Sequence, residues 1–231
     1  MNKTSQVFGA ACGPLCAIGW ILGFWCFAGF IPPPEPSAGP DEIVAFYQSN
    51  TNSIRLGLTI LMFAGAFYAP WTAVITVQMK RIEGTHSPMA YTQLALGAVF
   101  VLVFILPVMM WETAAFRPEG SPEIVQRLND LGWITFLNPV STIFVQGLAI
   151  AVVIFQDKRS EPVFPRWAAY FNVWSVLVFL PGALLVFFKS GPFAWNGLLA
   201  WWIPLGVFTI WMLTMSWLLY RAIQQQSLTE A

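Results

Sequence analysis

Residues 94–110 read LALGAVFVLVFILPVMM, and this run decides the fold class because it contains no charged residue. It lies within a longer stretch, residues 90–114, in which Glu112 is the sole charged side chain. A helix needs about 20 mostly apolar residues to cross the hydrocarbon core of a bilayer. The stretch therefore predicts a transmembrane helix.

The composition of the whole chain points to the same class of protein. Of its 231 residues, 57% are hydrophobic and 10% are charged, whereas ordinary soluble domains have about 25% charged residues. The mean hydropathy is +0.65. We predict an all-α integral membrane protein, with a bundle of six transmembrane helices forming a single domain over residues 1–231. The predicted spans cover about residues 7–31, 54–79, 90–114, 132–155, 167–188 and 197–220.

Two similar segments follow the first and third spans: residues 30–44, FIPPPEPSAGPDEIV, and residues 116–130, FRPEGSPEIVQRLND. Proline is favoured at the first position of a helix, and acidic side chains stabilise its N-terminal end. We therefore expect two short amphipathic surface helices on the outer side, at about residues 40–52 and 122–130. Lys-Arg pairs also end the second and fourth spans. The repeat predicts three hairpins in one orientation, the last one shortened; two independent helix starts are the alternative.

The distribution of basic residues predicts the orientation, because cytoplasmic loops carry more Lys and Arg. With the N-terminus inside, seven basic residues fall on the inner side and four on the outer side. We therefore expect both termini in the cytoplasm and a location in the bacterial inner membrane.

Several kinds of chemistry are not expected from this sequence. His86 is the single histidine, and it lies in a loop. Paired histidine ligands for an intramembrane haem or a di-iron site are therefore missing. No HExxH, CxxC, GxSxG or phosphate-binding glycine loop occurs. We expect no metal, no cofactor and no nucleic-acid partner, and an enzymatic function is not favoured.

Prolines and aromatic residues are the unusual features of the spans. Each span contains one proline, namely Pro14, Pro70, Pro107, Pro139, Pro181 and Pro204. A proline inside a helix removes a hydrogen bond and kinks the helix, so six kinked helices can enclose a cavity; proline is, however, common in membrane helices. Twelve Trp and twenty Phe exceed what two interfacial belts need. They face lipid, pack between helices or line a cavity, and periodicity does not separate these roles.

The candidate ligand-binding residues lie mainly at the outer ends of the spans, where half-desolvated charges beside aromatic walls are typical of ligand sites. Trp111 and Gln146 belong to the same hypothesis, the first as part of the wall and the second as a polar group near mid-membrane. Anchoring at the membrane interface and hydrogen bonds between helices are the alternatives. The complete predicted set is Arg55, Trp111, Glu112, Arg117, Asp130, Gln146, Lys189 and Asn196.

Three functions remain open from the sequence. The first is binding or transport of a small apolar or amphipathic molecule by a protein embedded in the lipid bilayer, with the polar residues as an outer rim above an aromatic, proline-kinked cavity. The second is a non-catalytic scaffold or accessory subunit that forms a homo-oligomer or joins a membrane partner subunit. The third is a cofactor-free membrane enzyme that acts on a lipid-soluble substrate with Glu112 as acid or base.

Overall fold

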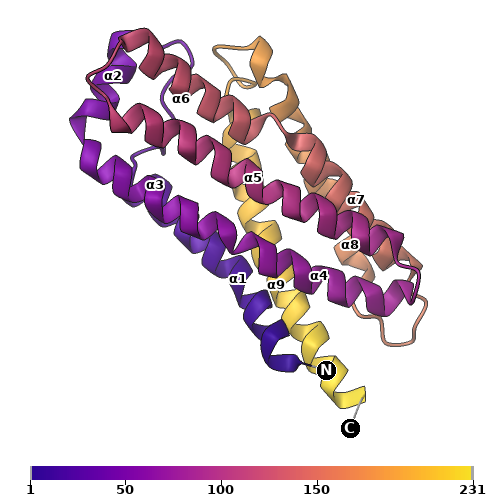
Figure 1. The fold of residues 1–231 in the computed structure, drawn as a ribbon. Helices are drawn as coiled ribbons and strands as arrows, with labels where there is room; N and C mark the ends of the chain where they lie inside the picture. The colour runs from indigo at the N-terminus through magenta and orange to yellow at the C-terminus, as the bar shows by residue number, and fades with distance from the viewer. Residues whose placement is uncertain (1, 230–231) are drawn as a thin grey trace.

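The computed structural model describes residues 2–229, and the side chains of residues 2–226. All regular structure in this part of the chain is helical (Figure 1), which confirms the predicted all-α class. The elements are α1 (Lys3–Ile21), a π-helical segment η1 (Leu22–Phe27), α2 (Pro40–Ser49), α3 (Thr51–Ala66), α4 (Tyr68–Glu83), α5 (Pro88–Phe116), α6 (Pro122–Leu137), α7 (Val140–Gln156), α8 (Arg166–Phe179), a 3₁₀ segment η2 (Leu180–Phe187), a second π-helical segment η3 (Leu198–Trp202) and α9 (Ile203–Thr229).

Six helical stretches of the described chain are long and apolar enough to cross a membrane, as predicted. Five of the six are each built from two consecutive elements, which are two α-helices, an α-helix and a 3₁₀ segment, or an α-helix and a π-helical segment. The stretches are Lys3–Phe27, Thr51–Glu83, Pro88–Phe116, Pro122–Gln156, Arg166–Phe187 and Leu198–Gln226.

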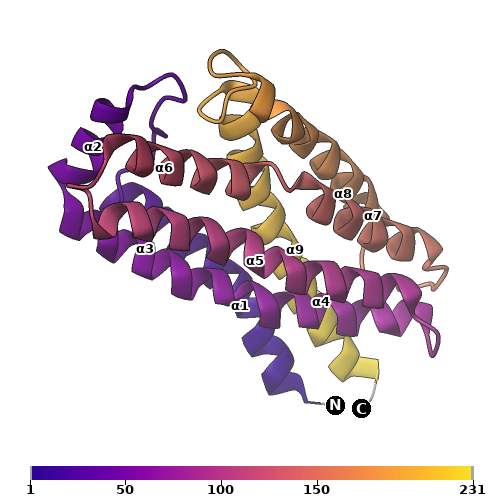
Figure 2. The ribbon, with the colours of Figure 1, turned by 45° about the horizontal axis from the view of Figure 1, so that its top comes forward.

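Helix α5 lies centrally and packs against α3, α4, α6 and α7, while α1 packs against α3, α4 and α9. The start of α1 and the last part of α9 lie side by side at one end of the bundle (Figures 1 and 2). There the Lys3 ammonium donates a hydrogen bond of 2.9 Å to the Gln224 side-chain oxygen. Towards the other end the two helices separate (Figure 2).

Small residues allow the close contact between the first and second spans. A Cβ atom added at Gly57 would lie 2.6 Å from the backbone nitrogen of Ala28 and 2.7 Å from the carbonyl oxygen of Gly23. A Cβ atom at Gly19 would lie 2.5 Å from that of Ala64. Glycine at these positions therefore lets the two backbones touch, which is the usual device of helix pairs in membranes.

Prolines coincide with most of the helix interruptions. Pro70 lies in the first turn of α4, just after the break at Phe67, and Pro139 separates α6 from α7. Pro204 follows η3 at the start of α9. Pro14 lies inside the continuous helix α1. A proline has no N–H to give to the preceding turn, and this explains why the helices restart at several of these positions.

The two predicted surface helices differ from each other in the structure. Helix α2 is a separate short helix, but its apolar residues Ile43 and Tyr47 are buried against the bundle, where α2 packs on α6. The helix expected at 122–130 does not end there, because α6 continues to Leu137. Gly132 lies between Asp130 and Pro139 and is a weak helix former. Helix α6 nevertheless continues through it, so the predicted surface helix is the first half of a longer one.

Candidate functional site

A cavity of about 800 Å³ lies between the first span and the last span, where α1 and α9 separate. Helices α5 and α6 contribute one side chain each to its wall. The lining residues are Cys16, Ala17, Trp20, Ile21, Phe24, Trp25, Ile31, Pro32, Phe104, Phe136, Trp201, Trp202, Leu205, Gly206, Phe208, Thr209, Ile210 and Met212.

Both π-helical segments of the described chain border this cavity. Phe24 and Trp25 come from η1, and Trp201 and Trp202 come from η3. The wider turn shows in the hydrogen bond from the Ile203 amide to the Leu198 carbonyl, five residues earlier. Single π-helical turns are rare and occur often at functional sites. Here they bring two pairs of aromatic side chains to one space, and the rings of Phe24 and Trp201 are in contact, with centroids 5.9 Å apart.

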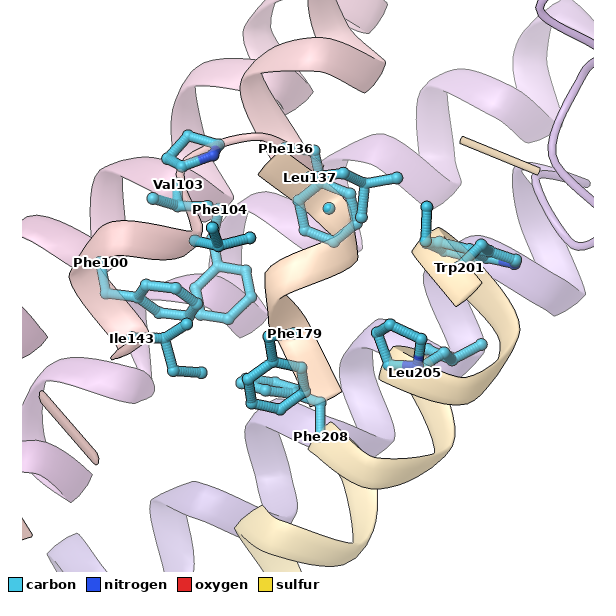
Figure 3. Close-up of a pocket in the computed structure, with 15 residues that line it drawn as sticks. Phe100, Val103, Phe104, Phe136, Leu137, Ile143, Phe179, Trp201, Leu205 and Phe208 are labelled. Atoms are coloured by element: carbon cyan, nitrogen blue, oxygen red, sulfur yellow. The ribbon is translucent and has the colours of Figure 1, made fainter. Parts of the chain in front are cut away.

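A second cavity, of about 100 Å³, adjoins the first one and is shown in Figure 3. In that view Phe100 and Phe104 of α5, Phe179 of α8 and Phe208 of α9 surround the same space. The break between α6 and α7 also borders it, because Pro139 is part of the lining. Five residues line both cavities: Phe104, Phe136, Trp201, Leu205 and Phe208.

The larger cavity opens on the side of the bundle. Several of its lining residues lie at the surface, including Trp25, which is 65% exposed, and Ile210, which is 57% exposed. Both belong to stretches long and apolar enough to cross a membrane. The opening is therefore bordered by apolar side chains rather than by the polar loops at the ends of the bundle.

No charged residue lines either of these two cavities. The Thr209 hydroxyl donates to the Leu205 carbonyl oxygen at 2.8 Å, so its proton is already used within the helix. Cys16 and four tryptophans are the other lining residues with a polar side-chain atom, and the indole nitrogens of Trp20 and Trp201 are themselves buried. A charged ligand would lose its hydration here without gaining a counter-ion, which is strongly unfavourable.

The indole N–H groups divide into two classes. Away from the cavity, the buried indoles of Trp71 and Trp211 donate at 2.9 Å to Ser216 and Asn172, and that of Trp111 donates to the Asn129 carbonyl oxygen at 3.3 Å. Within residues 2–226, four buried side-chain atoms have no hydrogen-bond partner: the indole nitrogens of Trp20, Trp133 and Trp201, and the Ser175 hydroxyl oxygen. The three indoles without a partner all pack around Phe24, with ring centroids 5.0 to 6.0 Å from its own.

Arg55 takes part in a structural interaction at the end of α5. Its guanidinium donates to the carbonyl oxygens of Ala115 and Phe116 at 3.0 and 3.1 Å, and to the Asn52 side chain at 3.4 Å. A cation at this position satisfies the free carbonyls at the C-terminus of a helix and stabilises the helix dipole. The structure therefore gives Arg55 a defined role without a ligand.

The other predicted rim residues lie at the same end of the bundle but are not joined by ion pairs in the described chain. Lys189 lies close enough to Asp130 for their charges to attract. Glu112 is half-buried, and Arg117 is exposed beside the ring of Phe116. Asn196 is half-buried in the loop before η3. None of the predicted rim residues lines either of the two aromatic cavities.

A hydrogen-bond chain connects α2 and α6 near this rim. The Tyr47 hydroxyl donates to the Asn129 side-chain oxygen at 3.2 Å, and the Asn129 amide donates to Asp130 at 3.4 Å. Burial, and then the negative charge of Asp130, raise the pKa of Tyr47 well above its usual value. Tyr47 is therefore a neutral donor at physiological pH and fixes α2 on the bundle.

The remaining predicted residues, Trp111 and Gln146, are fully buried. The Tyr68 hydroxyl donates to the Gln146 oxygen at 2.9 Å, and the Gln146 amide donates to the Thr72 hydroxyl at 3.2 Å. Gln93 donates to the same hydroxyl. This network connects α4, α5 and α7, and neither Trp111 nor Gln146 lines the two aromatic cavities.

Comparison with protein-family models, with curated proteins and with solved structures found no match for this chain. The function therefore has to be argued from the site itself. The sequence pattern indicated mainly polar residues together with Trp111, whereas the larger of the two aromatic cavities is lined by residues that include Trp20, Phe24 and Trp201. The signal that pointed towards it was the excess of aromatic residues together with the prolines.

Proposed function

We propose that this chain is an integral membrane protein that binds a small apolar molecule, taken from the bilayer, in the cavity between α1 and α9. The observation that carries the proposal is the cavity of about 800 Å³ without a charged lining residue. Pockets for small molecules usually measure about 300 to 1,000 Å³ and are mostly apolar. The volume and the chemistry of the walls both suit such a ligand.

The lateral opening supports entry from the membrane. Trp25 and Ile210 are more than half exposed at the border of the cavity. In a bilayer these side chains contact lipid, so a hydrophobic molecule reaches the cavity without crossing water. Release of the same molecule towards the outer end, where the polar rim lies, would make the protein a transporter.

The proposed topology follows from charge and from the arrangement of the ends. The start of α1 and the last part of α9 lie at the same end of the bundle. This agrees with an even number of crossings, after which the chain returns to the side of the membrane where it began. The count of seven basic residues against four supports a cytoplasmic location of this end in a bacterial cell. We include the three-hairpin arrangement in the same proposal, on the basis of the repeated outer and inner motifs.

Photolabelling in lipid vesicles tests the proposed function. A neutral phenyl-diazirine is added to vesicles that contain the purified protein and is activated by light, and labelled residues are mapped by mass spectrometry. The expected result is strong labelling of residues that line the cavity, including Trp20 and Trp201. Labelling confined to exposed helix faces would overturn the proposal and favour the scaffold function.

Gly206 offers a variant that fills the cavity without disturbing the packing. It lines the cavity, and a Cβ atom added there would meet no atom within 4 Å. Gly206→Phe should therefore fold and lose most of the labelling of the cavity walls. Ala98→Phe is the matched control, because Ala98 lies exposed on α5 and outside both cavities. Equal labelling of the two variants would contradict the assignment of the site.

A further inference from the structure

The cavity between α1 and α9 occupies only one half of the bundle. On the last span its lining residues run from Trp201 to Met212, which lie in the first half of that span. On the first span they run from Cys16 to Trp25, which lie in the second half. The two spans run in opposite directions (Figure 2). Both sets of residues therefore lie in the half of the bundle that is remote from the chain termini.

The narrow end of the cavity is closed where α1 and α9 touch. A Cβ atom added at Gly13, about one turn before Cys16, would overlap the Ser216 hydroxyl oxygen of α9. The Trp71 indole N–H donates a hydrogen bond of 2.9 Å to the same hydroxyl. Ser216 follows Met212 by one turn, so side chains fill the space between the helices just beyond the cavity. The cavity therefore ends near the middle of the bundle.

The length of the cavity equals the depth of one leaflet. At about 1.5 Å of rise per residue, the helical run from Trp201 to Met212 is about 16 Å long. Half of the hydrocarbon core of a bilayer measures about 15 Å, which is the depth that the acyl chains of one leaflet cover. A compact molecule would leave part of this length empty, and the lining would lose its contacts there. An extended hydrocarbon chain fills it.

The wide end of the cavity has the features of a membrane interface. Trp25 and Trp202 border it and are 65% and 42% exposed, and tryptophan gathers where the hydrocarbon core meets the polar headgroups. Ile31 and Pro32, in the loop that follows the first span, also line this end. A polar head can stay hydrated here, whereas deeper in the cavity it would lose its water.

We propose that the cavity holds an extended hydrocarbon chain of a membrane lipid from the leaflet at its wide end. The end of the chain lies near the contact between Gly13 and Ser216, and the polar head lies at the level of Trp25 and Trp202. Lipids of the opposite leaflet are excluded, because the two helices touch on that side. This inference rests on the proposed function and names the part of the ligand that enters the cavity.

Photoreactive lysophosphatidylcholine tests both the chain and the leaflet. The probe has one acyl chain with a diazirine at its end, and its charged head opposes passage through the hydrocarbon core, so it stays in the leaflet to which it is added. The protein is reconstituted in vesicles, and an antibody to a C-terminal tag measures its orientation. Palmitoyl and decanoyl probes are compared, each added to one side of the membrane, and labelled residues are mapped by mass spectrometry.

The palmitoyl probe, added on the side opposite the termini, should label Thr209, which lines the deep part of the cavity. This labelling should saturate with probe concentration and should be lost when the probe is added on the side of the termini. The decanoyl probe is too short to reach Thr209 and should label Trp202 instead. Leu213 is the control, because it is 46% exposed and lines neither cavity. Its labelling should rise in proportion to probe concentration.

Gly206→Phe blocks the path of the chain, because Gly206 lies between Trp202 and Thr209 on the last span and lines the cavity. In this variant the palmitoyl probe should no longer label Thr209, while Leu213 is still labelled. Ala98→Phe should leave both unchanged.

The outcomes separate this inference from the proposed function. Labelling of Thr209 from both sides would overturn the leaflet, and equal labelling of Thr209 by both chain lengths would overturn the extended chain. Labelling of Thr209 that does not saturate would show contact with bulk lipid only and would also overturn the inference. A cavity that is labelled by the phenyl-diazirine but by neither lysolipid would overturn the inference and leave the proposed function in place. Absence of cavity labelling by all three probes would overturn the proposed function itself.

Discussion

Two tryptophans of the last span allow a direct measurement of what an indole N–H without a partner costs. Trp201 and Trp211 are 2% and 1% exposed. The Trp211 N–H donates to the Asn172 side-chain oxygen at 2.9 Å, whereas the Trp201 N–H has no acceptor. Trp→Phe removes the same atoms at both positions. The loss of ring volume is therefore similar, and the hydrogen bond makes the difference.

The expected difference follows from the contacts. Trp211→Phe loses a hydrogen bond, which contributes about 0.6 to 1.7 kcal/mol inside membrane bundles. It also leaves the Asn172 oxygen without its donor, at a cost of about 1 kcal/mol or more. Trp201→Phe removes a donor that was already unsatisfied and so relieves a penalty. Trp211→Phe should lower the free energy of unfolding by about 2 kcal/mol more than Trp201→Phe, about 30-fold in the unfolding equilibrium.

Unfolding of the ligand-free protein by sodium dodecyl sulfate in mixed micelles, followed by circular dichroism, measures this difference. The two variants and the unsubstituted protein are compared at the same lipid and detergent composition. If Trp201→Phe destabilises the fold as much as Trp211→Phe, the Trp201 N–H has a partner in the folded protein.

Two further predictions concern the fold. Gly57→Val should prevent the contact between η1 and α3, because even a Cβ atom would lie 2.7 Å from the Gly23 carbonyl oxygen. The yield of folded protein should drop sharply in gel filtration. Burial raises the pKa of Asp157, but hydrogen bonds from Arg159 and the Val163 amide outweigh it and leave the pKa below its usual value. Asp157 should therefore stabilise the fold above pH about 4 and lose this effect in acid, so that Asp157→Asn lowers the melting temperature at pH 7 but not at low pH.

Each of these two predictions has a control and a contradicting result. Gly206→Ala should fold at least as well as the unsubstituted protein, because the added Cβ atom meets open space and alanine favours the helix. Normal folding of Gly57→Val would show that the helices do not touch at this point. A melting-temperature difference for Asp157→Asn that stays constant between pH 3 and pH 7 would contradict the role given to the ionised carboxylate.

Much of the architecture could be predicted because its causes are local. Residues 94–110 must be shielded from water, and in a helix their backbone N–H and C=O groups form hydrogen bonds within the same segment. Gly19 and Gly23 lie four residues apart, on one side of their helical stretch, and the structure shows them in close contact with Ala64 and Gly57. The length of the second surface helix was not predictable in the same way. Its continuation to Leu137 depends on the packing of α6 along α5.

The site was harder to predict because it depends on contacts between residues far apart in the chain. Arg55 was expected at a ligand rim, but it finds the free carbonyls of α5 some 60 positions later. Trp20 and Trp201 come from opposite ends of the sequence and meet at one cavity. No local pattern reports which of twelve tryptophans have acceptors.

By itself, the sequence determined the helical class and the positions of the six apolar stretches. The reason is that hydrophobicity and backbone hydrogen bonding both act within each segment. Its prolines also determined where several helices break, because proline lacks the N–H that the preceding turn needs. Only the tertiary structure decided that α1 and α9 separate around a cavity and that the indoles of Trp20 and Trp201 lie there without acceptors. The reason is physical: an unfilled volume and an unpaired donor are properties of what surrounds a residue in space, and neighbours in the chain do not fix them.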